Sequence, residues 1–144
     1  MLACDTNILF PAMESSHTDH AKARLWLRSQ VVNTQFVLCE LTLLETYLLL
    51  RNPAVMRKTL EAPAAVALIG SLRSNPVWRI IDYPGGLMPA VWKEAAKAGT
   101  TFRRIVDTRM ALTLRHHGVT QFATANLKHF GGFGFAKLWN PLTA

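Results

Sequence analysis

The chain has 144 residues, half of them hydrophobic, and we expect one domain over residues 1–144. Its 16 Lys and Arg residues against 9 Asp and Glu residues give a formal charge of +7, which favours an anionic partner such as nucleic acid or an acidic protein. The longest apolar run is broken by Glu40 and Glu45, and it falls short of the ~20 residues that a membrane span needs. Because Asp5 comes too early for a secretory signal, we expect a cytoplasmic protein with no membrane partner.

The first ten residues carry the pattern around which the rest is interpreted. The small and apolar residues 2–4 run into Asp5, and Thr6 and Asn7 then favour the start of a helix. This order predicts a buried strand that delivers the Asp5 carboxylate to the end of a sheet. The alternative is that Asp5 only caps the following helix.

Helices and strands alternate along the remaining chain. A helix is expected to start at Ser16, with Asp19 completing a capping box and with Ala21, Leu25 and Trp26 as its apolar stripe. We then expect, in chain order, a strand over 36–40, helices over 42–51, 54–60 and 62–72, a strand over 77–82, helices over 87–98 and 105–117, a strand over 121–124 and an edge strand over 135–139. The alternation predicts an α/β fold with a mainly parallel sheet, in which ligands bind beyond the carboxyl ends of the strands.

The two cysteines, Cys4 and Cys39, both fall in predicted buried strands. A small thiol is ordinary core filler there. We expect neither a disulfide nor a cysteine-based zinc site, because neither cysteine has a partner at ligand spacing.

Three of the nine acidic residues lie in apolar surroundings. Besides Asp5, Glu45 interrupts a leucine-rich run, where we expect it to share a helix face with Leu41, Leu48 and Leu49. Asp107 follows Ile105 and Val106, on a face that continues through Ala111 and Leu114. Carboxylates enter such surroundings chiefly when they are paired or bind metal, and a hard cation such as Mg²⁺ removes the repulsion among them.

Each of these acids also has a simpler interpretation. Thr42 and Glu45 have the spacing of a capping box, and Asp107 in a first helical turn suits the helix dipole. Neither role requires catalysis.

Taken together, the pieces resemble a known family. Asp5-Thr6-Asn7 after a terminal strand, Glu45 in its leucine run, Asp107 at the head of a helix and the segment 124–130 resemble the PIN domain, and the resemblance is closest to the toxin ribonucleases of VapBC-type toxin–antitoxin pairs. It covers essentially the whole chain. It implies a three-layer α/β/α domain in which Asp5, Glu45 and Asp107 coordinate Mg²⁺ or Mn²⁺ and RNA phosphodiesters are hydrolysed. It also implies a homodimer and a small VapB-like antitoxin that occupies the site.

The chain departs from the family pattern at two positions. Asn126 falls on the fourth acidic position, and His129 stands where an aspartate often precedes Phe. Asn126 can still offer one neutral oxygen, although such a residue is more often a turn former. The lost negative charge predicts weaker metal binding or one metal in place of two. Thr6, Asn7 and Thr124 are candidates for orienting the acidic ligands.

Basic residues gather in the segment that leads to the helix of Asp107. Lys93, Lys97, Arg103 and Arg104 are candidates for contacts to RNA phosphates, and a solvated helix face is the equal alternative.

Two other functions compete with the ribonuclease. An aspartate-nucleophile phosphatase also begins with a strand that ends in aspartate, but it has a second aspartate where this chain has Asn7. A PIN-like module that binds RNA or protein without turnover would follow if the missing fourth acid had ended catalysis.

Overall fold

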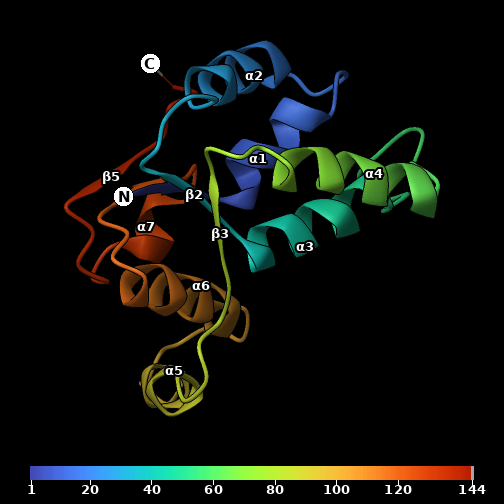
Figure 1. Ribbon diagram of the computed structural model, residues 1–144. Helices are drawn as coiled ribbons and strands as arrows, with labels where there is room; N and C mark the ends of the chain where they lie inside the picture. Colours follow the sequence, from blue (N-terminus) through green and yellow to red (C-terminus); the bar gives the residue numbers. More distant parts are fainter. Residues whose placement is uncertain (144) are drawn as a thin grey trace.

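One parallel sheet of five short strands forms the centre of the computed structural model, which describes residues 1–143 (Figure 1). The strands are β1 (Leu2–Cys4), β2 (Phe36–Cys39), β3 (Arg79–Ile81), β4 (Gln121–Ala123) and β5 (Lys137–Trp139). The helices are α1 (Thr6–Met13), α2 (His20–Ser29), α3 (Glu40–Leu50), α4 (Ala62–Arg73), α5 (Met88–Ala95), α6 (Arg104–His116) and α7 (Leu127–Phe130). The predicted α/β class is confirmed.

The sheet has its first strand at the centre. Its order is β3-β2-β1-β4-β5, with every neighbouring pair parallel. The chain winds outward from β1 to β2 and β3, and then returns to place β4 on the other side of β1. The two directions of winding therefore diverge between β1 and β4, which is where open α/β sheets form their ligand crevice.

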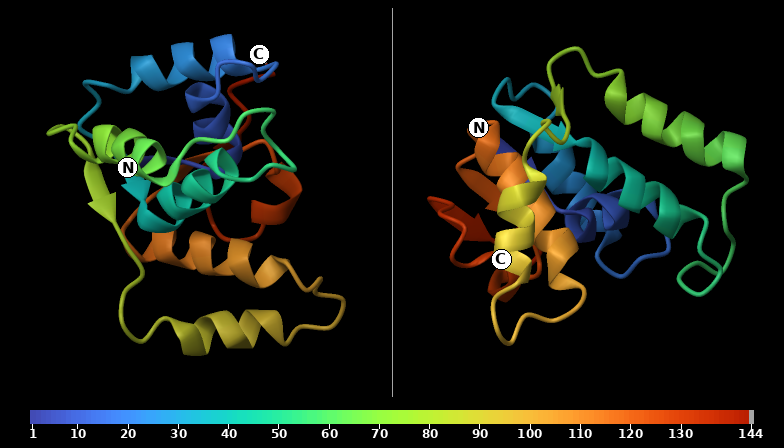
Figure 2. Two further views of the ribbon diagram at one scale, coloured as in Figure 1. Left: turned by 90° about the vertical axis from the view of Figure 1, so that its right-hand side faces the viewer. Right: turned by 90° about the horizontal axis from the view of Figure 1, so that it is seen from below.

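Alternate side chains of the strands feed two separate cores, as the period of a strand requires. Cys4, Leu38 and Ala123 pack on one face with residues of α1, α2 and α4. Ala3, Val37 and Phe122 pack on the other face with residues of α6 and α7. Helix α5 lies outside α6, away from the sheet (Figures 1 and 2). The sheet is thus the middle of three layers.

The start of the second helix was predicted wrongly. Helix α2 begins at His20, and Asp19 precedes it without a side-chain capping bond, while Ser16 lies in a turn and bonds to Glu14. The predicted apolar stripe is correct for Trp26, which packs against the core, but Leu25 is 73% exposed and Ala23 and Leu27 are the buried residues of the helix.

The predicted helix over 54–60 is also wrong, because this segment consists of turn, bend and irregular backbone. The side chain of Asn52 accepts the N–H of Ala54, and its carbonyl accepts the N–H groups of Val55 and Met56. An asparagine side chain that bonds the backbone two residues on competes with helix formation.

The buried face of α3 differs from the prediction as well. Leu48 is 56% exposed, and the buried positions are Thr42, Leu43, Thr46 and Leu50. A helix rich in leucine on all sides gives no clear stripe, so tertiary packing decides which side is covered. No helix within residues 1–143 has the length and apolar character needed to cross a membrane.

Candidate active site at the ends of β1 and β4

The pairing of β1 with β4 brings Asp5 and Thr124 together. Cys4 and Ala123 are partners in the sheet, so the residues that follow them emerge side by side. The Asp5 N–H donates to the Ala123 carbonyl at 2.9 Å, and the Thr124 hydroxyl donates to Asp5 Oδ2 at 2.7 Å. The expected strand with a carboxylate at its end is confirmed.

The Asp5 carboxylate is almost fully enclosed, at 8% exposure. Its Oδ1 accepts the Thr6 N–H at 2.8 Å and its Oδ2 accepts the Asn7 side-chain amide at 3.1 Å. Asp5 is therefore the N-cap of α1, as the simpler interpretation held, and also a carboxylate at the strand end. Burial raises the pKa of Asp5 against the lowering effect of these hydrogen bonds, and the nearby Asp107 raises it further.

Thr6 and Asn7 link Asp5 to the rest of the site. The Thr6 hydroxyl donates to Glu45 Oε2 at 3.1 Å. Asn7 accepts the Ala125 N–H at 2.9 Å and donates to the Thr124 hydroxyl oxygen at 3.3 Å. All three residues suggested as orienting groups thus contact one another or an acidic side chain.

Glu45 comes to the site from the second turn of α3. The helix begins at Glu40 with Cys39 as its N-cap, so Thr42 lies inside the helix and the capping-box alternative is wrong. Partial burial raises the pKa of Glu45, the Thr6 hydroxyl lowers it, and Asp5 and Asp107 raise it further.

Asp107 lies in the first turn of α6, on the face that continues through the buried Ala111 and Leu114, as predicted. Its Oδ2 is 3.1 Å from His129 Nδ1. Partial burial raises the pKa of Asp107, and the charges of His129 and Arg104 and the His129 hydrogen bond lower it. Asp107 in turn raises the pKa of both other acids, so the three carboxylates form one electrostatic cluster.

The cluster is not yet a closed ligand cage. Within residues 1–143, no three His, Cys, Asp or Glu side chains are already grouped as a metal site. Glu45 and Asp107 are only partly buried, and in the part of the chain that the structure describes each has a single side-chain partner.

Asn126 lies at the margin of this cluster. It precedes α7, its side chain is exposed and makes no capping bond, and its N–H donates to the Thr124 hydroxyl oxygen at 3.0 Å. The contact of His129 with Asp107 was missed from the sequence. The available signal was the position of His129 two residues into a short helix after β4, on a segment already expected near the site.

The four basic candidates differ in their surroundings. Lys93 is exposed, Lys97 pairs with Glu94 at 2.7 Å, and the Arg103 guanidinium lies 5.5 Å from the ring centre of the exposed Phe102. Arg104 alone reaches the site, where it donates to the His129 carbonyl at 3.1 Å.

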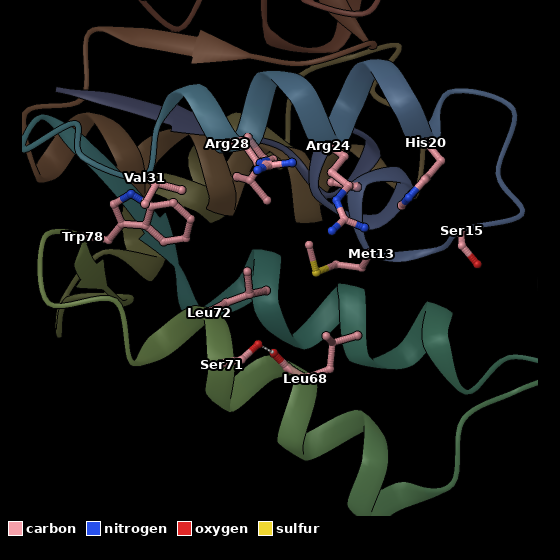
Figure 3. A pocket seen from close by; sticks show the side chains of 12 residues that line it. Met13, Ser15, His20, Arg24, Arg28, Val31, Leu68, Ser71, Leu72 and Trp78 are labelled. Atoms are coloured by element: carbon pink, nitrogen blue, oxygen red, sulfur yellow. Dashed lines mark hydrogen bonds between the residues drawn. The ribbon is translucent and has the colours of Figure 1, made fainter.

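A separate groove lies away from this cluster. It has a volume of about 530 Å³ and lies between α2 and α4, and none of the acidic candidates lines it. Figure 3 shows His20, Arg24 and Arg28 on the α2 side and Leu68, Ser71 and Leu72 on the α4 side. Its mixed apolar and basic lining differs from the acidic cluster at the sheet edge.

No family model matches the chain. It is 41% identical over 144 residues to Ribonuclease VapC24 of Mycobacterium tuberculosis, covering 100% of this chain and 99% of the relative, in both strain CDC 1551 and strain H37Rv.

Solved structures share the fold at lower identity. VapC20 of Mycobacterium tuberculosis, described as a Sarcin-Ricin loop cleaving toxin, has a TM-score of 0.67 at 22% identity and covers 95% of this chain and 98% of its own. FitAcB from Neisseria gonorrhoeae has a TM-score of 0.66 at 19% identity, with 100% of both chains covered. DNA-bound VapBC from Salmonella typhimurium has a TM-score of 0.66 at 16% identity, with 97% of both covered. By its full-length relationship to VapC24, the chain belongs to the VapC family of PIN-domain ribonucleases.

Proposed function

We propose that the protein is a divalent-metal-dependent endoribonuclease, the toxin of a VapBC-type toxin–antitoxin pair, with its site at the ends of β1 and β4. The observation that carries the proposal is the cluster of Asp5, Glu45 and Asp107, in which the charge of Asp107 raises the pKa of the other two acids. The full-length relative is named a ribonuclease, which supports RNA as the substrate.

The donor set fits a hard cation. Carboxylate oxygens are the preferred ligands of Mg²⁺ and Mn²⁺, and the net effect at all three acids is a raised pKa, the reverse of what a strong pairing cation in the protein would cause. Among the residues that the structure describes, 1–143, His129 is the only ion-pair partner of the three. A bound cation would lower the pKa of a water and neutralise charge at the cleaved phosphodiester.

The residues of the chain have distinct roles in this proposal. Asp5 and Asp107 hold the cation, and Glu45 holds the cation or its water. Thr124 and Asn7 fix the Asp5 carboxylate, and Thr6 joins Asp5 to Glu45 through its N–H and its hydroxyl. Asn126, with its exposed amide, adds at most a neutral oxygen, so we assign one cation to the site rather than two.

We assign the binding of RNA phosphates to Lys93, Lys97, Arg103 and Arg104. They lie on α5, on the loop after it and at the start of α6, so the chain carries them toward the helical turn that holds Asp107. Arg104 reaches the site, and the positive charge of the other three residues on the approach to α6 would draw the RNA backbone toward it. We place this activity in the cytoplasm, where RNA is accessible.

The partners follow from the family. Similar solved structures include FitAB and VapBC bound to DNA. We propose that this toxin likewise pairs with a small antitoxin protein, that it forms a homodimer, and that residues 1–144 make up a single domain.

The decisive experiment is cleavage of a mixed-sequence RNA by purified protein in Mg²⁺, Mn²⁺ or EDTA. Asp5→Asn and Asp107→Asn should each abolish metal-dependent cleavage. Asp82→Asn is the matched control, because Asp82 is an exposed aspartate that also follows a strand of this sheet and should leave cleavage unchanged.

Other results would redirect the assignment. Cleavage that persists in EDTA or in both variants would contradict the metal mechanism. No cleavage together with no rise in melting temperature on adding Mn²⁺ would favour the binding module without turnover.

A further inference from the structure

Each of the three carboxylates is held by a side chain from a different element. Thr124, after β4, donates its hydroxyl to Asp5, and Thr6, on α1, donates its hydroxyl to Glu45. For Asp107 the partner is His129 on α7, at 3.1 Å. In the described part of the chain, residues 1–143, no other side chain is bonded to the Asp107 carboxylate.

His129 is itself fixed in place. Its carbonyl accepts a hydrogen bond from the Arg104 guanidinium at 3.1 Å, and its N–H donates to the Asn126 carbonyl at 3.1 Å. The next residue, Phe130, is buried and packs edge to face on Phe122 of β4, with ring centres 4.8 Å apart. The half-exposed imidazole is therefore carried by an anchored backbone.

Arg104 closes the arrangement from the side of α6. It is the first residue of that helix, one turn before Asp107, and its guanidinium also lies 5.4 Å from the ring centre of Phe133. Arg104 and Asp107, both in the first turn of α6, thus each contact His129 on α7 and hold it between them.

We propose that His129, held by Arg104, is the positioning residue for Asp107: its Nδ1–H donates to Asp107 Oδ2 and fixes the orientation in which this carboxylate would hold the cation. The inference rests on the proposed metal-dependent function. A neutral imidazole with its proton on Nδ1 is sufficient for this donation. Partners of this kind orient a ligand, and their removal typically weakens metal binding about 10–100-fold.

The proposal explains why histidine suits this position. An aspartate at position 129 would place a like charge beside Asp107 and disfavour its ionised form. Histidine supplies a donor at the same place. At position 129 the chain thus has a hydrogen-bond donor to Asp107 where an aspartate would add a further negative charge. Asn126, which precedes the same helix, is likewise neutral.

The test is the affinity for Mn²⁺ without RNA, measured by titration calorimetry on the full chain. His129→Ala should weaken Mn²⁺ binding about 10–100-fold. His129→Asn should restore most of the affinity, because its amide nitrogen can stand near the position of Nδ1. Arg104→Ala should also weaken binding, and the absence of RNA separates this effect from any phosphate contact of Arg104. The control is His116→Ala, because His116 is an exposed histidine at the other end of α6; this variant should bind Mn²⁺ as tightly as the unaltered protein does.

The outcomes separate this inference from the proposed function. Unaltered affinity in His129→Ala, or equal losses in His129→Ala and His129→Asn, would overturn the positioning role while Asp107→Asn still abolished binding. If the unaltered protein itself failed to bind Mn²⁺, the proposed metal dependence would fail and the positioning role with it. Melting curves in EDTA confirm that each variant is folded.

Discussion

The two aspartates of the site are held in contrasting ways. Asp5 is 8% exposed and accepts three hydrogen bonds, from the backbone of α1, from Asn7 and from Thr124. The Asp107 side chain is 29% exposed, and His129 is its single side-chain partner among the described residues 1–143. Strand pairing sets the first arrangement, and the packing of two helices sets the second.

This difference gives the two sides of the site different mechanical properties. The Asp5 side is pre-organised, because β1 and β4 cannot change register without disrupting the sheet on both faces. The Asp107 side can adjust, because a side chain with one partner loses little by turning. We therefore expect mutations on the Asp5 side to affect stability and activity together, and those on the Asp107 side to affect metal binding more than stability.

Both aspartates raise the pKa of Glu45, and after Asp5→Asn and Asp107→Asn the neutralisation of Glu45 should have the largest effect. Glu45→Gln should reduce cleavage by more than about 100-fold, because loss of a ligand should exceed the ~10–100-fold typical of a ligand's partner. The same variant should melt at a higher temperature in EDTA, because it removes a partly buried charge repelled by Asp5 and Asp107. Cleavage assays and calorimetry check both effects.

The control for this prediction is Glu14→Gln. Hydrogen bonds from Ser16 hold the pKa of Glu14 below its usual range, so its neutralisation should not stabilise the protein. A lower melting temperature in Glu45→Gln would show that Glu45 is a structural residue.

Thr124→Val tests the pre-organised side. The change keeps the shape of a fully buried side chain and deletes the hydroxyl that bonds Asp5, Asn7 and the Asn126 backbone. The free energy of unfolding should fall by about 1–3 kcal/mol, because buried polar groups lose a partner, and cleavage should fall with it. Urea denaturation measures the first effect.

Thr113→Val is the matched variant for Thr124→Val. Thr113 is a buried threonine of α6, and within residues 1–143 its hydroxyl bonds only the carbonyl of Arg109, one turn earlier in the same helix. Thr113→Val should leave cleavage unchanged and should lower the free energy of unfolding less than Thr124→Val does. Equal losses of stability and of cleavage in Thr124→Val and Thr113→Val would show that the Asp5 side is not specially pre-organised.

The pH dependence should have opposite signs with and without metal. The pKa values of Asp5, Glu45 and Asp107 are raised in the folded protein, so these groups stay protonated at pH values where the unfolded chain has already lost the protons. Their contribution to the free energy of unfolding therefore falls as pH rises above the ordinary carboxyl range near pH ~4. In EDTA the melting-temperature advantage of Glu45→Gln should therefore widen as pH rises through this window. Stabilisation by Mn²⁺ requires ionised carboxylates and should instead decline as pH falls. A melting-temperature advantage of Glu45→Gln that narrowed with rising pH would contradict a raised pKa of Glu45 in the folded protein.

The smallest effect is expected at the basic surface. The double variant Lys93→Gln/Lys97→Gln should weaken RNA binding and reduce the salt dependence of affinity by about 0.7 in logarithmic slope for each phosphate that the two lysines no longer neutralise. Fluorescence anisotropy at several salt concentrations measures this slope. Arg24→Gln/Arg28→Gln removes the same charge beside the α2–α4 groove and should leave the slope unchanged. Equal changes in both would mean that net charge alone attracts RNA.

Local patterns in the sequence predicted much of the fold. A buried strand before Asp5, a helix face shared by Asp107, Ala111 and Leu114, and glycine and proline breaks between elements all depend on neighbouring residues. Predictions failed where a local rule met a competing one. The Asn52 side chain accepted the N–H of Ala54 in competition with a helix, and the leucines of α3 offered no single face.

The sequence by itself determined which acidic side chains stand at the ends of strands and helices, because those positions follow from composition and period within a few residues. Only the tertiary structure decided how they are held. Thr124 meets Asp5 across a separation of 119 residues through the register of β1 with β4, and His129 meets Asp107 through the packing of α7 on α6. Such contacts depend on strand pairing and side-chain burial that form only when the whole chain is folded, and no local pattern encodes them.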